Sequence, residues 1–224
     1  MTAEIVECRA CPRLVAWREA VAAERRASFR DEEYWGRPVP GFGDPAARLL
    51  VVGLAPAAHG GNRTGRVFTG DRSGDWLYRA LWKQGFANQP SSVHAADGLE
   101  LCDAYVAAAV RCAPPANKPT PEERDTCRPY LVRELALLDR VMVVVALGRF
   151  AHDVVCGLLA GGRGGAARPR FGHLAEHVVD GGRTLIDSFH PSQQNTFTGK
   201  LTELAFDAVF ARGRALIEAP SAAR

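Results

Sequence analysis

The sequence predicts an α/β fold in which a parallel β-sheet is covered by helices on both faces. Apolar stretches with the composition of buried strands alternate with amphipathic helical segments along the chain. This alternation favours parallel strands, because each helix can carry the chain back to the start of the next strand. With 224 residues, 47% of them apolar, the chain can build one sizeable core. We therefore expect a single domain spanning residues 1–224.

Four stretches are expected to be buried strands, because each is a short apolar run rich in β-branched residues or alanine. They are residues 48–53 (RLLVVG), 105–110 (YVAAAV), 141–147 (VMVVVAL) and 184–189 (TLIDSF). In parallel sheets ligands bind where the carboxyl ends of the strands meet. The loops that follow residues 53, 110 and 189 carry unusual residues, whereas GRFAHD after the third strand predicts a simple strand-to-helix turn.

Five amphipathic segments are expected to be helices, at residues 12–26, 73–84, 121–138, 149–159 and 201–217. Pro121 and Glu122 are typical of a first helical turn and support the third of these. The Gly- and Arg-rich stretch from Gly157 to Arg170 predicts a surface loop whose arginines could touch DNA, although a solvated connection is the simpler interpretation.

Composition argues against a membrane or secreted protein. No apolar run reaches eighteen residues, and the start, MTAEIVECRACPRLV, lacks the regions of a secretion signal, so we expect a cytoplasmic protein. The net charge is +3, and of 28 basic residues only Lys83, Lys118 and Lys200 are lysines. Arginine is the better partner for phosphate, but a codon bias toward Arg, Ala and Gly explains at least half of the excess. Charge therefore permits nucleic acid without predicting it.

Four cysteines predict one metal site assembled by folding. Cys8 and Cys11 form a C-x2-C pair, and Cys112 and Cys127 follow about a hundred residues later with fourteen residues between them. Zinc sites usually use two tight pairs, so the wide second spacing favours an iron–sulfur cluster while leaving zinc open. The remaining cysteines, Cys102 and Cys156, are expected to be small buried hydrophobic residues.

The long loop from Gly53 to Asp71 predicts a ligand site. Its glycines allow close approach of a ligand, Arg63 and Arg66 can meet phosphate, and Phe68 offers a flat apolar face. It is not a P-loop, because no G-K-[ST] follows. Structural alternatives stay open for single residues: Phe68 as a core aromatic and Asp71 as a helix N-cap.

Two further loops carry polar side chains at strand ends. His190 follows the last strand and is expected to point into the cleft, ahead of the polar run from Pro191 to Lys200. The loop at residues 111–120 contains Cys112 and Asn117, whose amide can donate to and accept from a base edge.

Taken together, GLAPAAHGGNRTGRVFTGD, VRCAPPANKPTPEE, HPSQQNTFTGKLT and the four cysteines resemble the uracil-DNA glycosylase superfamily, and within it family 5, the type-5 or B-type iron–sulfur enzymes. The resemblance extends from Cys8 past Lys200. It implies a three-layer α/β/α sandwich with a central four-stranded parallel sheet and a 4Fe–4S cluster on Cys8, Cys11, Cys112 and Cys127. It also implies hydrolysis of the N-glycosidic bond of uracil, hypoxanthine and xanthine in double-stranded DNA. We expect a monofunctional enzyme, because Lys118 and Lys200 are the only lysines in the motif loops and neither is obviously placed to form a Schiff base, and we expect a monomer.

The resemblance also implies residue roles. Other branches place Asp or Asn soon after the glycine that ends the first strand, whereas residues 53–57 here, GLAPA, have no polar side chain. That absence is typical of family 5 and turns attention to Asp71, which would stabilise the sugar cation or orient water. His190 would donate a hydrogen bond to the leaving base. Phe68 would stack on the flipped base, and Asn117 with the backbone near Ala55 would read its edge.

The resemblance further implies how the chain holds DNA. Arg63 and Arg66 would contact phosphates, and the wedge that fills the space of the flipped base would consist of Pro191, Ser192, Gln193, Gln194 and Asn195. Two rival functions stay open: a non-catalytic iron–sulfur protein that binds damaged DNA, and a zinc-stabilised α/β hydrolase acting on nucleotides. The presence of both Asp71 and His190 argues against the first, and the lack of a phosphate loop argues against the second.

Overall fold

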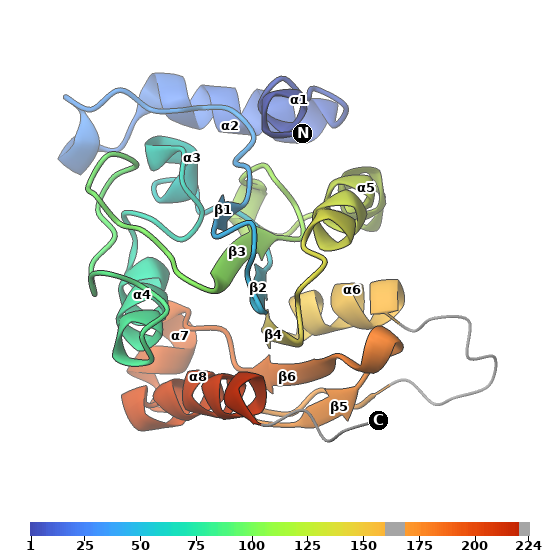
Figure 1. Cartoon of the computed structure of the whole chain (residues 1–224). Helices are drawn as coiled ribbons and strands as arrows, with labels where there is room; N and C mark the ends of the chain where they lie inside the picture. The colour runs from blue at the N-terminus through green and yellow to red at the C-terminus, as the bar shows by residue number, and fades with distance from the viewer. Residues whose placement is uncertain (160–168, 220–224) are drawn as a thin grey trace.

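One six-stranded sheet organises the computed structural model, which describes residues 1–159 and 169–219 (Figure 1). The strand order is β1-β3-β2-β4-β6-β5. The strands are β1 (Phe42–Gly43), β2 (Leu49–Gly53), β3 (Ala104–Ala108), β4 (Val143–Leu147), β5 (Glu176–Val178) and β6 (Thr184–Ser188). The central strands β3, β2, β4 and β6 pair in parallel, which confirms the predicted four-stranded parallel sheet.

Two antiparallel edge strands, β1 and β5, extend that sheet and were not predicted. They have two and three residues. A periodicity of two residues cannot be recognised in so short a segment, and two of the three residues of β5 are moreover polar. The parallel core was predictable because its strands are buried on both faces and are therefore mostly apolar, with Asp187 and Ser188 of β6 as buried polar exceptions.

Helices cover both faces of the sheet in three layers (Figure 1). The longer helices agree with the predicted segments to within two residues at each end. The helices are α1 (Thr2–Val6), α2 (Pro12–Glu24), α3 (Gly61–Thr64), α4 (Arg72–Lys83), α5 (Pro121–Leu137), α6 (Arg149–Leu159), α7 (Gln193–Phe197) and α8 (Glu203–Glu218), with single 3-10 turns at Ala27–Phe29, Pro115–Asn117 and Asp180–Gly182.

The side chains of β2 alternate between the two faces of the sheet and show how the two hydrophobic cores form. Leu49 and Val51 pack on one face with α4 and α8, whereas Leu50 and Val52 pack on the other with α5 and α6. This sandwich leaves the carboxyl ends of the parallel strands free of core helices, and the loops that carry the predicted site residues begin there.

Two expectations need correction, and one of them lies partly outside the described residues. Helix α6 continues to Leu159, so the Gly157–Arg170 stretch begins as helix, and its residues 160–168 lie outside the described part of the chain. Cys156 is buried as expected, but Cys102 is exposed. Among the described residues, no helix is long and apolar enough to cross a membrane.

Candidate active site and cysteine centre

Cys8, Cys11, Cys112 and Cys127 come together as the structure's cysteine centre. Cys8 follows α1, Cys11 precedes α2, Cys112 follows β3 and Cys127 lies inside α5. All four line one small pocket, together with apolar residues of α2 and Tyr130 of α5. The predicted convergence of the distant cysteines is therefore present.

Helix ends position the cysteines. Cys11 is the N-cap residue of α2, followed by Pro12 at the first helical position, where a missing N–H costs nothing. Thr120 caps α5 through a capping box with Glu123. Arg13 donates from Nε and Nη2 to the Glu123 carboxylate at 2.8 and 2.7 Å, so an ion pair joins the starts of the two helices.

Buried donors point at two of the sulfurs. Arg18, only 2% exposed, donates from Nη1 to Sγ of Cys112 at 3.0 Å, and the backbone N–H of Arg111 donates to Sγ of Cys127 at 3.2 Å. Burial raises the pKa of the Cys112 thiol to about 11 and that of the Cys127 thiol to about 12. Such N–H···S bonds and a buried guanidinium suit sulfurs that carry negative charge, as metal-bound thiolates do.

Sulfur spacing tests which metal fits. Four thiolates on one tetrahedral zinc ion lie about 3.8 Å apart, given Zn–S bonds of about 2.3 Å. In the described part of the chain, the one group of three or more His, Cys, Asp or Glu whose donor atoms all lie within 4.8 Å of one another contains no cysteine. The four-sulfur set and its wider spacing therefore fit an iron–sulfur cluster better than a single zinc ion.

A cleft of about 650 Å³ opens at the carboxyl ends of the parallel strands. It combines residues of the loops after β2, β3 and β6, as the sheet topology predicts. The lining residues are Leu54, Ala55, Ala57, Phe68, Asp71, Arg72, Ser73, Ala116, Asn117, His190, Ser192, Gln193 and Gln194. Both predicted catalytic residues and all three predicted base-binding residues are among them.

Phe68 forms an apolar wall of this cleft. Its ring lies against the backbone of Gly53, where a β-carbon would sit 2.5 Å from the Phe68 Cζ atom, so only glycine fits at the end of β2. The Phe68 backbone has φ 51°, in the left-handed region that is costly for a bulky residue. Its ring centroid lies 5.9 Å from that of His190. The loop thus holds the ring beside His190 at a cost in backbone strain.

Asp71 is both a helix cap and a cleft residue. It is the N-cap of α4, and its Oδ1 accepts from the backbone N–H of Gly74 at 3.0 Å. A β-carbon on Gly60 would lie 2.0 Å from Asp71 Oδ2, so this glycine makes room for the carboxylate. Burial raises the pKa of Asp71 above its ordinary value. The structural and functional interpretations of this residue are therefore compatible.

His190 sits two residues beyond β6, half-buried against the backbone of Gly148. Its carbonyl accepts from Nδ2 of Asn195 at 2.8 Å, which ties the following turn back onto it. Burial lowers the pKa of His190 to about 4. At neutral pH the ring is therefore uncharged and keeps one N–H that can donate a hydrogen bond. Gly148 was missed by the sequence analysis, which treated its loop as a plain turn.

The prediction that Arg63 and Arg66 contact DNA phosphate does not fit their surroundings. Arg63 is 7% exposed and Arg66 is 5% exposed. The Arg63 guanidinium pairs with Glu32 and donates to the Gly70 carbonyl at 3.0 Å, and that of Arg66 pairs with Asp97 at 2.7 Å. These side chains satisfy a carbonyl of the long loop and acids of the neighbouring segments, Glu32 and Asp97.

Arg72 is the cleft cation that the sequence analysis missed. It is exposed, and its guanidinium carbon lies 4.3 Å from the ring centroid of Phe197, which is 67% exposed. Its position in the first turn of α4 gave no sign of a role beyond helix formation. Only folding, which brings α4 beside α7, places this arginine next to the cleft.

The predicted wedge divides into exposed and structural residues. Pro191 is buried, and Ser192 caps α7 by accepting from the Asn195 N–H at 3.4 Å. Gln193 and Gln194 are exposed and line the cleft, at the start of a short helix that was predicted as loop. If this segment enters DNA, these two glutamines are therefore its tip, and Pro191 is not available for contact.

The cleft and the cysteine centre share a wall. Ala55, on the cleft, packs against the apolar cluster that contains Cys112 and Cys127. Asn117, five residues after Cys112, is exposed and lines the cleft with a left-handed backbone at φ 55°. A change at the cysteine centre would consequently reach the cleft through both residues.

Comparison with known proteins shows which family this sequence is similar to. The sequence profile of the uracil DNA glycosylase superfamily matches residues 40–212. The chain is 54% identical to the type-5 uracil-DNA glycosylase of Mycobacterium tuberculosis over 96% of this chain and 80% of that protein, and 52% identical to that of Thermus thermophilus over 95% and 94%. It is also 36% identical to the type-4 uracil-DNA glycosylase of Archaeoglobus fulgidus, over 54% of this chain and 53% of that protein.

Proposed function

The chain belongs to the uracil DNA glycosylase superfamily, and we propose that its cleft hydrolyses the N-glycosyl bond of uracil in DNA and leaves an abasic site. The observation that carries the proposal is that Asp71 and His190 line the same cleft, with Phe68 beside His190. A carboxylate, a hydrogen-bond donor and an aromatic face are the groups that this reaction needs in one place.

Breaking the bond builds positive charge on the deoxyribose and negative charge on the departing base. Asp71 is the residue for the positive end, where its carboxylate stabilises the sugar cation or orients the attacking water. The water supplies the hydroxyl group at the sugar carbon, and its proton balances the charge on the base. The contact with the Gly74 N–H holds the carboxylate at the N-terminus of α4, so it is positioned before substrate arrives.

His190 is the residue for the negative end. With its pKa lowered to about 4, the ring is uncharged at neutral pH and donates one hydrogen bond to the leaving base. The ring resists protonation in this site, so the proposed role is that of a neutral donor and not of a general acid. Gly148 behind the ring and Asn195 on its carbonyl hold it in place.

The flipped base is expected to stack on Phe68, with Asn117 and the backbone near Ala55 at its edge. These groups include no charged reader of the base, which supports acceptance of hypoxanthine and xanthine besides uracil. Gln193 and Gln194 then occupy the gap in double-stranded DNA from which the base came. Arg72, and not Arg63 or Arg66, becomes the proposed contact to a nearby phosphate.

We further propose that the cysteine centre holds a 4Fe–4S cluster, whose contribution when bound is to cross-link the N-terminal segment to the β3–α5 loop. Arg18 and the Arg111 N–H supply positive potential to its sulfurs. The chemistry stays with the cleft, because Ala55 and Asn117 connect the two sites only through packing and a shared loop.

The experiment uses wild-type protein on a duplex that carries one uracil, with matched duplexes that carry hypoxanthine, xanthine or no damage. Alkali then cleaves any abasic site, and the fragments are separated by length. We expect strand cleavage at uracil only after alkali, as a monofunctional glycosylase requires. Tight binding to the uracil duplex without any abasic product would instead support the rival function, a non-catalytic protein that binds damaged DNA.

A further inference from the structure

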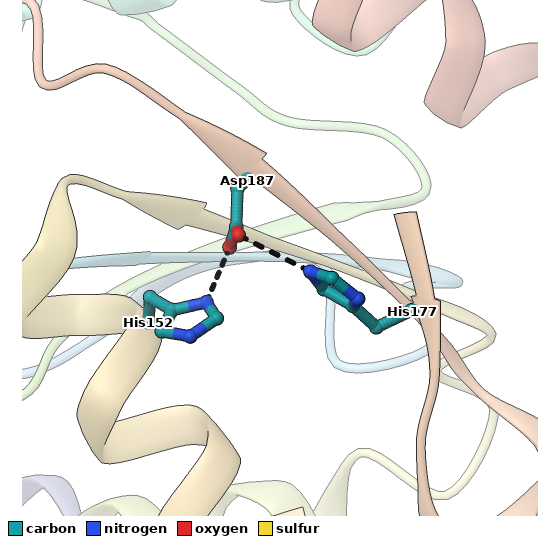
Figure 2. Close-up of side chains that lie close together, drawn as sticks. All are labelled: His152, His177 and Asp187. Atoms are coloured by element: carbon teal, nitrogen blue, oxygen red, sulfur yellow. Dashed lines mark hydrogen bonds and ion pairs between the residues drawn. The ribbon is translucent and has the colours of Figure 1, made fainter. Parts of the chain in front are cut away.

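A second group of metal-type donors lies apart from the cysteine centre, between α6 and the edge of the sheet. His152 projects from α6, His177 from β5 and Asp187 from β6, and Figure 2 shows the two imidazoles converging on the carboxylate. The three donor atoms all lie within 4.8 Å of one another. Neither the proposed reaction nor the proposed cluster uses any of these side chains.

Sheet register explains why these residues meet. His177 of β5 is directly opposite Leu185 of β6, and Asp187 lies two residues further along. Because side chains alternate between faces, His177, Leu185 and Asp187 all point to the same face. Leu185 packs in the core that α6 covers, and this helix brings His152 over the carboxylate. The group is therefore built by three elements of the fold and is not a surface accident.

In the described residues, the contacts of this group leave one imidazole nitrogen without a hydrogen bond and the carboxylate without a Lys or Arg, while His152 Nε2 lies 3.0 Å from the Pro169 carbonyl oxygen. Asp187 is fully buried, and among the described residues its carboxylate contacts no Lys or Arg. His152 Nδ1 lies 2.8 Å from Oδ1 of Asp187. His177 Nε2 is buried without a hydrogen-bond partner in the described chain, and it lies 3.5 Å from Oδ2 of Asp187. A cation between these atoms would satisfy the orphaned nitrogen and the buried carboxylate together.

We propose that His152, His177 and Asp187 bind one divalent transition-metal ion of the zinc class. Two imidazoles and a carboxylate are zinc ligands, and tetrahedral bonds of about 2.0–2.1 Å place such donors about 3.3 Å apart. The spacings of 2.8 and 3.5 Å on either side of Asp187 bracket that value. Cys156, one helical turn after His152 with its Sγ 3.8 Å from Nδ1, is the candidate fourth ligand.

The site has a route from solvent and a structural consequence. The His177 side chain is 20% exposed on the edge strand, whereas His152 and Asp187 are closed off. The backbone of Asp187 also bonds to Leu174 and Ala175. A bound ion would therefore link β5 and the segment before it to α6. Its ligand Asp187 lies three residues before His190 in the chain. We expect zinc to stabilise this edge of the sheet without entering the cleft.

The test is a zinc titration in which purified protein competes with a chromophoric chelator. The protein retains its iron, and wild type is compared with His177→Gln. His94→Ala is the matched control, because it removes an exposed imidazole elsewhere. We expect wild type and the control to bind one zinc ion per chain with iron content unchanged. His177→Gln should bind at least about tenfold more weakly. X-ray absorption at the zinc edge should show imidazole scattering, which His177→Gln loses in part.

Two results would overturn the proposal. One is equal zinc affinity in wild type and His177→Gln. The other is zinc uptake that occurs only as iron is lost, which would assign the ion to the cysteine centre. Because His177 lies on a partly exposed edge strand, its substitution is expected to leave the fold intact, and circular dichroism checks this. Cys156→Ser in the same titration tests the fourth ligand: an intermediate loss of affinity supports it, and wild-type affinity removes Cys156 from the site.

Discussion

The cysteine centre and the cleft lie on either side of Ala55, yet they are built in different ways. The centre draws its ligands from two helix ends, a helix interior and the loop after β3, and the Arg13–Glu123 ion pair ties the starts of α2 and α5 together. The cleft is made of loops at strand ends, and its residues depend on close packing around Gly53 and Gly60. The comparison indicates that the centre supplies rigidity, whereas the cleft supplies the reactive groups. The predictions that follow test that division of labour.

The largest effect is expected for Cys112→Ser, which removes a buried sulfur of the centre. Loss of a structural metal group usually removes much of the folding free energy, so we expect loss of iron, brown colour and thermal stability together. Cys102→Ser is the control, because Cys102 is exposed and outside the centre. Iron analysis and thermal melting measure both variants. A Cys112→Ser protein that melts like wild type without iron would contradict the structural role of the centre.

His190→Ala is expected to slow base release about a hundredfold or more, because it removes one donor to the leaving base, while iron content stays at wild-type level. Single-turnover assays measure the rate. The pH profile checks the mechanism: the pKa of His190 is about 4, so the ring stays neutral from pH 8 down to pH 5. A rate that changes with a pKa near 6.5 and loses that step in His190→Ala would contradict the neutral-donor role.

Arg18→Met is expected to weaken the centre without direct effect on chemistry. The substitution removes a buried charged donor to Cys112, a contact worth about 1.5–3 kcal/mol. The melting temperature should fall and iron should be lost faster to a chelator, while the initial rate per iron-loaded molecule stays near wild type. The control Arg9→Met removes only an exposed ion pair with Glu19, which solvent screens and which contributes little to stability. Equal effects of the two variants would show that the sulfur contact is unimportant.

The smallest expected effect is on DNA binding, and it distinguishes the exposed Arg72 from the buried Arg63. Arg72→Ala should weaken duplex binding several-fold and reduce the salt slope by about one, because one phosphate contact is lost. Arg63→Met should instead lower stability, because Glu32 and the Gly70 carbonyl lose their buried partner, and it should leave the salt slope unchanged. Binding at several salt concentrations and thermal melting distinguish these outcomes, and a reversed pattern would restore the original prediction for Arg63.

Prediction from the sequence succeeded where the residue type alone restricts the structural role that a residue can have. Three of the four parallel strands are almost entirely apolar, and cysteines in a C-x2-C pair have few other uses, so most of the sheet and the centre were predictable. Arginines have no such restriction. Arg63 and Arg72 look alike in sequence, and only the fold shows that the first is buried against Glu32 and the second is exposed beside the cleft.

Other features were hidden because they depend on tertiary contact. Gly148 looked like an ordinary turn residue until the fold placed His190 against it. The group of His152, His177 and Asp187 is spread over three elements, one of them the three-residue strand β5. Register between strands decides that these side chains meet, and register cannot be deduced from so short a segment.

The most direct test of the division between cleft and centre is the single-turnover rate of uracil release by Asp71→Asn, measured together with iron per chain. Asparagine is also a good N-cap, so α4 should stay intact while the carboxylate is lost. We predict a rate about 100- to 1,000-fold below wild type, with iron and melting temperature unchanged. Asp75→Asn, an exposed neighbour on the same helix, should react like wild type. Uracil release by Asp71→Asn at the wild-type rate would contradict the account.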